Sequence, residues 1–266
     1  MEQLIQKQVA VPGSWIGVDV YGEADGPAIM VIPGAMADAS GWARVARNLG
    51  PWATVAVVNR RGRRPSGPLT DEYGVGTEVS DAMEVLKTFG DVRAVFGWSY
   101  GGLIALHLAG ALDVPHVIAY EPVVAPFGVT ALPDLRRAQE QADPDARLRI
   151  ALEQVAGLGR ESVARLRDDG ATWAELMRLA APAYYETLAI NEAPPATELA
   201  VRARRIDLII GGRNRGRAPY GSSFADVERL VPGTMVHELG EQGHLAHLEA
   251  PRELADLVNR LGSEAG

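Results

Sequence analysis

The sequence predicts an α/β fold: a mostly parallel eight-stranded sheet flanked by helices, with an inserted helical cap. Three observations support this prediction. Short β-type runs alternate with longer helical patterns, which is typical of a parallel sheet covered by helices. The run Ala28–Ile32 is apolar throughout, as expected of a strand buried on both faces. Residues 123–203 are helical in pattern and interrupted by prolines, which indicates a separate helical segment.

The core elements are expected where the apolar pattern changes along the chain. Apolar alternation or continuous apolar runs predict strands at residues 14–21, 28–32, 54–58, 92–96, 116–120, 206–210 and 234–239. Apolar residues spaced three or four apart predict helices at residues 42–49, 75–89, 100–112, 226–230 and 248–261. Glycine or proline ends several segments, as Pro33-Gly34 does after the second strand and Gly90 after the second helix.

The length suits one large domain with an insertion, because 266 residues exceed what most single cores need. We expect residues 1–122 and 204–266 to form the core domain. Residues 123–203 are expected to form the helical cap, inserted between two strands of the sheet.

Composition excludes several classes of function. A net charge of -8 argues against nucleic acid or an anionic membrane as the main partner. The arginine clusters lack interleaved aromatic residues and are interpreted as solvated loop charges. They comprise Arg60, Arg61, Arg63 and Arg64, and further along Arg213, Arg215 and Arg217. The absence of cysteine excludes disulfides, thiolate metal sites and a cysteine nucleophile.

The sequence offers no sign of membrane targeting or of a bound cofactor. Residues 1–10 are polar and lack the apolar centre of a signal peptide. No apolar run approaches the roughly 18 residues that span a bilayer. Histidines and carboxylates do not follow a metal-ligand spacing. We therefore expect a cytoplasmic protein without metal or cofactor, a monomer or homodimer, whose partner is a small hydrophobic molecule.

The pentapeptide Gly-Trp-Ser-Tyr-Gly at residues 97–101 is the strongest motif in the chain. It lies between the strand at 92–96 and the helix at 100–112. A serine on such a tight strand-to-helix turn needs small residues on either side, and the helix N-terminus behind it favours developing negative charge. The motif predicts Ser99 as a nucleophile; the alternative is a purely structural turn.

Of the five histidines, two lie where an imidazole could reach this turn. His107 falls within a helix, and His116 and His237 fall within strands. His244 lies in a glycine-flanked loop after the last strand, at the sheet edge where open α/β sheets carry their sites. His244 is the predicted base, and His247 is the second candidate.

Acyl transfer also requires hydrogen-bond donors for an oxyanion. The residue after the nucleophile supplies one backbone N–H, here that of Tyr100. The loop after the strand at 28–32 supplies another, from Ala35 or, as second choice, Met36. The alternative for this loop is an ordinary turn that ends the strand.

With these motifs the chain resembles the α/β-hydrolase family, in particular its bacterial branch of esterases, lactonases and non-haem haloperoxidase-like perhydrolases. The matching segments occur in the family's order at residues 31–38, 59–63, 96–102, 119–122 and 242–251. The resemblance implies a serine, an acid and a histidine in that order along the chain. Epoxide and haloalkane hydrolysis in this fold use an aspartate nucleophile, so Ser99 argues against both.

The chain departs from the family at the acid, which together with the serine and the histidine forms the family's catalytic triad. The resemblance places an aspartate after the strand at 206–210, where this chain has Asn214. Asparagine can orient an imidazole but carries no charge to stabilise the imidazolium. Either Glu121, which follows the strand at 116–120, has taken over as the acid, or Asn214 orients the ring in a slow or non-hydrolytic protein.

Aromatic residues of the cap could roof a pocket for a hydrophobic substrate. The candidate substrate-binding residues are Trp98, Phe127, Trp173, Tyr184 and Tyr185. Ordinary packing is the alternative for each, and for Trp98 it means packing beneath the serine turn. The leading hypothesis is a serine hydrolase that cleaves a small ester, lactone or thioester through an acyl-enzyme. The alternative is a ligand-binding or biosynthetic-rearrangement protein with little hydrolysis.

Overall fold

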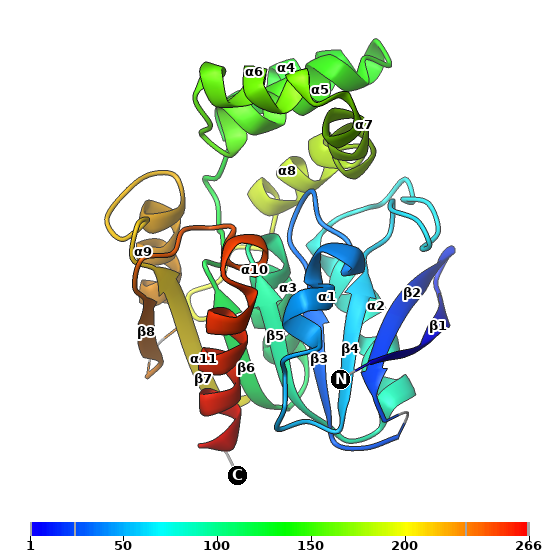
Figure 1. Cartoon of the computed structure of the whole chain (residues 1–266), viewed down its shortest axis with the longest axis vertical. Coiled ribbons are helices and arrows are strands. Elements are labelled where there is room, and N and C mark those ends of the chain that lie inside the picture. The colour runs from blue at the N-terminus through cyan, green and yellow to red at the C-terminus, as the bar shows by residue number, and fades with distance from the viewer. Residues whose placement is uncertain (1, 24, 232, 265–266) are drawn as a thin grey trace.

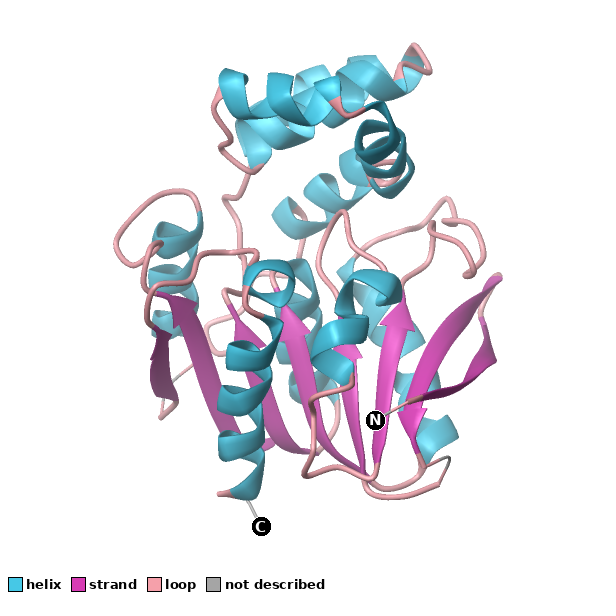
Figure 2. Ribbon diagram, viewed as in Figure 1, coloured by secondary structure: helices cyan, strands magenta, loops and turns pink. Residues whose placement is uncertain are grey.

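The computed structural model describes residues 2–23, 25–231 and 233–264, and these form one eight-stranded sheet (Figures 1 and 2). The strand order is β1-β2-β4-β3-β5-β6-β7-β8. The strands are β1 (Gln3–Val11), β2 (Ser14–Gly22), β3 (Ala28–Ile32), β4 (Thr54–Asn59), β5 (Val92–Trp98), β6 (Val114–Tyr120), β7 (Ala203–Gly211) and β8 (Met235–Leu239). The β1–β2 and β2–β4 pairs are antiparallel and the other five pairs are parallel, so the predicted mostly parallel sheet is confirmed.

Strand β3 shows why its sequence is apolar throughout. Met30 and Ile32 pack into the apolar core on one face of the sheet, together with helices α2 (Val75–Phe89), α3 (Tyr100–Ala111) and α9 (Tyr220–Leu230). The alternate residues Ile29 and Val31 pack into the core on the other face. That core also contains side chains of α1 (Ala39–Ala46), α10 (Ala246–Glu249) and α11 (Pro251–Ser263). Successive side chains of a strand point to opposite faces, so a strand covered on both sides needs no polar position.

Three expectations about the elements were incomplete or wrong. Strand β1 was missed, because its polar, partly exposed residues hide the strand pattern and it pairs only with β2. Helix α1 begins earlier than expected, where the Asp38 carboxylate caps the Ser40 N–H. The single closing helix is two helices, α10 and α11, because Pro251 lacks an N–H and begins the second.

Helices fill the chain between β6 and β7 and lie beyond the carboxyl ends of the parallel strands (Figure 1). They are η1 (Val129–Ala131), α4 (Leu132–Glu140), α5 (Pro144–Ile150), η2 (Ala151–Val155), α6 (Arg160–Asp168), α7 (Gly170–Leu179) and α8 (Ala183–Asn191). We refer to these helices as the cap. The cap has its own apolar cluster, which includes Leu135, Leu148 and Trp173.

Three of the four arginines in the first cluster are buried, contrary to the interpretation as solvated loop charges, whereas Arg64 is exposed as expected. Arg60, Arg61 and Arg63 are each 1–2% exposed. Each pairs with a buried carboxylate from a distant segment: Arg60 with Glu78 and Glu186, Arg61 with Asp81, and Arg63 with Glu186. The second cluster, around Arg213, is exposed as expected. Charged side chains become buried where carboxylates compensate them, and these partners lie too far along the chain to be inferred from sequence.

Within the described parts of the chain, no helix is both long and apolar enough to cross a bilayer.

Candidate active site

Ser99 occupies the sharp turn between β5 and α3. Its backbone angles are φ 56° and ψ −121°, in a region that side-chain-bearing residues rarely adopt. A Cβ on Gly97 would lie 2.4 Å from the Gly101 carbonyl oxygen, and a Cβ on Gly101 would lie 2.0 Å from the Ile32 carbonyl oxygen. Neither glycine can therefore be replaced without moving the backbone. The motif requires glycines because the chain passes too close on both sides of Ser99.

Backbone hydrogen bonds connect the turn to the end of β6 on one side and to the first turn of α3 on the other. The Ser99 N–H donates to the Tyr120 carbonyl at 3.0 Å, and the Ser99 carbonyl accepts the Gly102 N–H at 2.9 Å. Ser99 thus begins α3, whose N-terminal end carries a partial positive charge toward the serine. This arrangement favours an anion beside Ser99.

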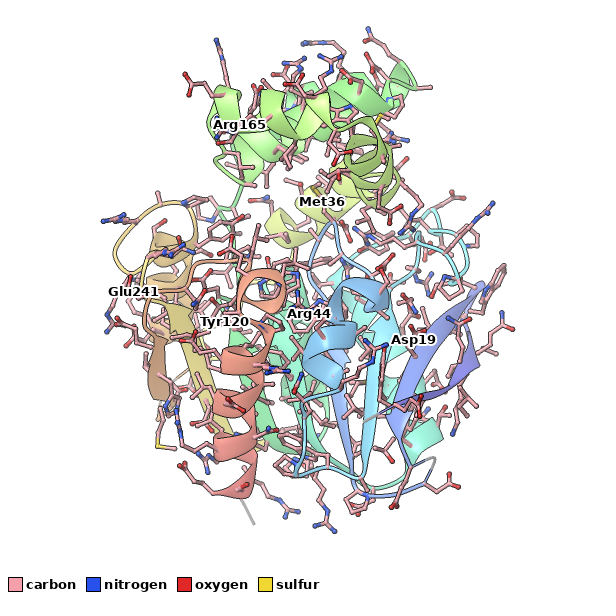
Figure 3. The ribbon with its side chains drawn as sticks, in the orientation of Figure 1. Asp19, Met36, Arg44, Tyr120, Arg165 and Glu241 are labelled. Carbon is pink, nitrogen blue, oxygen red and sulfur yellow. The ribbon has the colours of Figure 1, made fainter. Side chains whose placement is uncertain are left out.

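The loop after β3 passes directly against the serine turn. A Cβ on Gly34 would lie 2.8 Å from both Ser99 Cβ and a ring carbon of Trp98. The Gly34 backbone therefore packs against Ser99, and Ala35 and Met36 directly follow Gly34 in the chain. Met36 has a left-handed backbone, with φ 53°, and lies between the sheet edge and the cap (Figure 3).

Glu121 follows β6 and is fully buried, with an unusual positive φ of 42°. Its carboxylate lies 2.6 Å from Nδ1 of His244. The Gly211 N–H donates to Oε1 at 2.9 Å, and the Asn214 amide donates to both oxygens at 3.0 and 2.9 Å. Three strand ends, those of β6, β7 and β8, thus meet around one carboxylate.

The contacts of Asn214 distinguish the two possibilities left open by the sequence. Asn214 hydrogen-bonds to the Glu121 carboxylate, and Glu121 in turn faces the His244 ring. An ionised carboxylate only accepts hydrogen bonds, so Nδ1 of His244 carries the proton and Nε2 is left to accept one. Glu121 occupies the position relative to the imidazole that a triad acid requires.

Aromatic side chains hold His244 on several sides. The Trp98 indole N–H donates to the His244 carbonyl at 2.8 Å, and the two rings lie 4.8 Å apart. Tyr220 stacks on the imidazole with ring centroids 3.6 Å apart and planes 14° from parallel. The Tyr120 hydroxyl donates to the Gly243 carbonyl. The sequence analysis did not identify Tyr120 or Tyr220 as site residues. Tyr120 could have been identified, because it directly precedes Glu121 in residues 119–122, a segment that matches the family.

Burial lowers the pKa of His244 below its ordinary value, and this effect outweighs the opposing influence of Glu121. The imidazole is therefore neutral at pH 7, the form that can accept a proton. His247, the second candidate base, is buried between the rings of Trp42 and Trp98 at 4.7 and 4.3 Å. Burial, reinforced by nearby His244, lowers its pKa to about 3. His247 therefore stays neutral and packs as an aromatic ring.

The candidate substrate-binding residues lie in two places. Trp98 lies against the His244 ring, and Phe127 is buried with its ring 5.8 Å from that of Tyr220, the residue that stacks on the imidazole. Trp173 belongs to the apolar cluster of the cap, where its indole N–H donates to Asp145 at 2.9 Å. Tyr184 and Tyr185 pack edge to face on α8, and Tyr185 is exposed.

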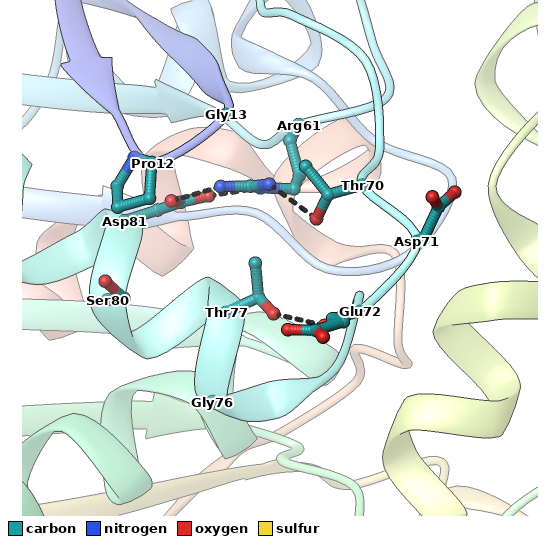
Figure 4. Close-up of a pocket in the computed structure, with 10 residues that line it drawn as sticks. All are labelled: Pro12, Gly13, Arg61, Thr70, Asp71, Glu72, Gly76, Thr77, Ser80 and Asp81. Carbon is teal, nitrogen blue, oxygen red and sulfur yellow. Dashed lines mark hydrogen bonds and ion pairs between the residues drawn. The ribbon is translucent and has the colours of Figure 1, made fainter.

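A pocket of about 570 Å³ lies apart from these residues, between the β1–β2 turn and the start of α2 (Figure 4). It is lined by Gly13, Thr77 and the Arg61–Asp81 ion pair, and none of Ser99, Glu121 or His244 lines it. The described residues also contain no group of three or more histidine and carboxylate side chains that could hold a metal ion. The chemistry available at the sheet edge is that of a serine, an imidazole and a carboxylate.

Comparisons with known proteins identify the family of the chain. The family model described as "Alpha/beta hydrolase family" matches residues 29–257. An uncharacterized hydrolase, YraK of Bacillus subtilis (strain 168), is 34% identical over 119 residues, which is 43% of this chain and 43% of the relative. The chain thus matches less than half the length of that curated relative.

Solved structures share the fold over nearly the whole chain. An alpha/beta hydrolase from Sphaerobacter thermophilus DSM 20745 has a TM-score of 0.76 at 23% identity, covering 96% of this chain and 99% of that one. The esterase RhEst1 from Rhodococcus sp. ECU1013 has a TM-score of 0.72 at 18% identity, covering 98% and 99%. With the family model spanning most of the sequence, the chain belongs to the alpha/beta hydrolase family of enzymes.

Proposed function

We propose that this enzyme is a serine hydrolase that cleaves a small hydrophobic ester, lactone or thioester through an acyl-enzyme. Ser99 is the nucleophile, His244 the base and Glu121 the acid of the triad. The observation that supports this most directly is the 2.6 Å contact between His244 Nδ1 and the buried Glu121 carboxylate. Solved esterases with the same fold, such as that from Rhodococcus, support the class of substrate.

The reaction would proceed in two steps. His244 Nε2 takes the Ser99 hydroxyl proton as Oγ attacks the acyl carbon, and Glu121 stabilises the imidazolium. The N–H groups of Tyr100 and Ala35 hold the oxyanion, with Met36 as the second possible donor from that loop. The leaving alcohol or thiol takes the proton from His244. Water then attacks the acyl-enzyme, with His244 again accepting a proton, and releases the acid.

The apolar surroundings favour a hydrophobic substrate. Phe127 and Tyr220 form a continuous aromatic surface that ends at the His244 ring. Met36 packs against the apolar cluster of the cap. A charged substrate would lose its hydration on entering such a site without an opposite charge to replace it.

Labelling with a fluorophosphonate probe, followed by mass spectrometry of the Ser99 peptide, tests the proposal. We expect the wild-type enzyme to be labelled and to hydrolyse short p-nitrophenyl esters. Ser99→Ala should abolish both, and His244→Ala should lower both by at least about a thousandfold. Ser222→Ala is a matched control, because Ser222 is an exposed serine whose hydroxyl donates to the Pro219 carbonyl.

The same experiment addresses the ligand-binding or rearrangement alternative, which rested on Asn214. Since Asn214 binds Glu121, the carboxylate that faces the ring, its presence no longer argues for a non-hydrolytic protein. A wild-type protein that binds hydrophobic esters tightly, yet neither turns them over nor reacts with the probe, would overturn the hydrolase proposal.

A further inference from the structure

Arg60, one of the buried arginines, reaches the loop that carries the proposed oxyanion donor. Its Nε donates to the Pro33 carbonyl at 2.8 Å, and its Nη2 donates to the Gly34 carbonyl at 2.7 Å. The guanidinium also lies over the ring of Tyr100, 4.9 Å from the centroid. Arg60 therefore touches both segments that supply donors to the oxyanion in the proposed reaction.

The contact with Gly34 has a geometric consequence for Ala35. The Gly34 carbonyl and the Ala35 N–H belong to one peptide unit, which is planar and, in its trans form, directs these two groups oppositely. A guanidinium that fixes the direction of the carbonyl therefore fixes the direction of the N–H. A charged donor on the carbonyl also polarises the unit and strengthens the N–H as a donor.

Two carboxylates hold Arg60 in turn, and one belongs to the cap. Glu78 of α2 accepts from Nη1 at 2.8 Å, and Glu186 of α8 accepts from Nη2. Glu186 also accepts two bonds from Arg63, at 2.7 and 2.6 Å. These four side chains are at most 3% exposed. The paired arginines lower the pKa of Glu186 to about 2 despite its burial, so it stays charged.

Further contacts join the cap to the same loop. Met36 packs against the cap's apolar cluster. Arg178 of α7 forms an ion pair with Asp38, the residue that caps α1. The segment from Pro33 to Asp38 is thus attached to the cap both through Arg60 and directly.

We propose that Arg60 is a positioning residue that orients the Ala35 N–H toward the oxyanion, and that Glu186 of the cap holds Arg60 in this place. This inference rests on the proposed function of Ser99 and the oxyanion loop. It assigns the cap a part in transition-state stabilisation in addition to covering the site.

Glu186→Gln is the primary test, because it keeps the shape of the side chain and removes its charge. We expect kcat to fall about 10- to 100-fold with KM within threefold, because loss of a whole oxyanion donor costs about 10²–10³-fold in kcat. Affinity for a trifluoromethyl ketone, which forms an oxyanion on Ser99, should fall in parallel with kcat. Arg60→Lys is the second variant: it keeps the buried positive charge but cannot bond both carbonyls at once.

Asp81→Asn is the matched control. Asp81 forms an equally buried two-bond pair with the neighbouring Arg61, at 2.6 Å for each bond, in the separate pocket of Figure 4. We expect Asp81→Asn to lower the melting temperature as Glu186→Gln does but to leave kcat and ketone affinity within twofold of wild type.

Equal kinetics for folded Glu186→Gln and Asp81→Asn would overturn the inference while leaving the serine mechanism intact. A fall in kcat without a fall in ketone affinity would also overturn it. Failure of the proposed function itself looks different: the wild-type enzyme would neither react with the fluorophosphonate nor turn over esters.

Discussion

Two buried carboxylates on the same sheet each contact histidine, and only one of them lies near a nucleophile. Glu121 faces His244 at 2.6 Å where β6 ends. Asp207, within β7, contacts His116 and His237 at 2.6 and 2.7 Å and also accepts from Arg205 at 2.7 Å. Both carboxylates are fully buried. We refer to these groups as the Glu121 cluster and the Asp207 cluster.

The clusters differ in what surrounds the histidine. His244 stands on a loop at the carboxyl edge of the sheet, near the Ser99 turn and the N-terminus of α3. His116 and His237 are fixed within strands, below that edge. Hydrogen bonds from His116, Arg205 and His237 lower the pKa of Asp207 to about 2 despite its burial, and Arg205 also pairs with it as an ion. A histidine–carboxylate pair is therefore not a catalytic device by itself; its place relative to the strand ends decides what it can do.

Replacing each carboxylate by alanine should give the largest difference between the two clusters, in turnover and in stability. Glu121→Ala should lower kcat by about 10³- to 10⁴-fold, because the imidazolium loses the charge that stabilises it. Asp207→Ala should leave kcat within about threefold but lower the free energy of unfolding by about 3 kcal/mol, because Arg205 and both histidines lose a buried hydrogen-bond acceptor. Ester kinetics and urea unfolding measure the two effects. Loss of turnover in folded Asp207→Ala would contradict the view that only the Glu121 cluster takes part in catalysis.

The pH dependence should separate the clusters further. The pKa of Asp207 lies near 2, below its ordinary 3.8, so its contribution to stability is present above about pH 4 and is lost as pH falls toward 2. That loss is about 2 kcal/mol, and Asp207→Asn should lack it in acid unfolding curves. Glu121 raises the pKa of His244, so Glu121→Gln should move the acid limb of kcat/KM to lower pH. An unmoved limb in Glu121→Gln would contradict the pairing.

Replacing the residue that donates hydrogen bonds to each carboxylate should give the smallest difference between the two clusters. Asn214 donates to Glu121 as Arg205 donates to Asp207. Asn214→Ala should lower kcat about 3- to 10-fold, because one hydrogen-bonding partner of the carboxylate is lost while its Gly211 bond remains. Arg205→Ala should lower the unfolding midpoint without changing kcat. If Asn214→Ala were more damaging than Glu121→Ala, Asn214 rather than Glu121 would be the residue that orients His244.

The turn at Ser99 and the first arginine cluster show how much of the structure the sequence could predict. The turn was predicted because its residues directly follow a buried strand and need no distant partner to be recognised. The arginines were misread because their carboxylate partners are remote: Glu186 lies 126 residues from Arg60 and 123 from Arg63. A run of arginines in a loop usually faces water, and only the folded chain brings α8 onto it.

The sequence by itself determined the fold class, the serine turn and the loop histidine, because each is encoded in a short segment. Apolar periodicity predicts strands and helices, and glycines beside Ser99 reflect a turn only a few residues long. Tertiary structure alone decided which carboxylate faces His244, since Glu121 and His244 are 123 residues apart. It likewise decided that Asn214 supports Glu121, that Tyr220 stacks on the imidazole, and that Arg60 holds Gly34. These contacts depend on strand order and cap placement, which bring side chains together from segments with no shared local pattern.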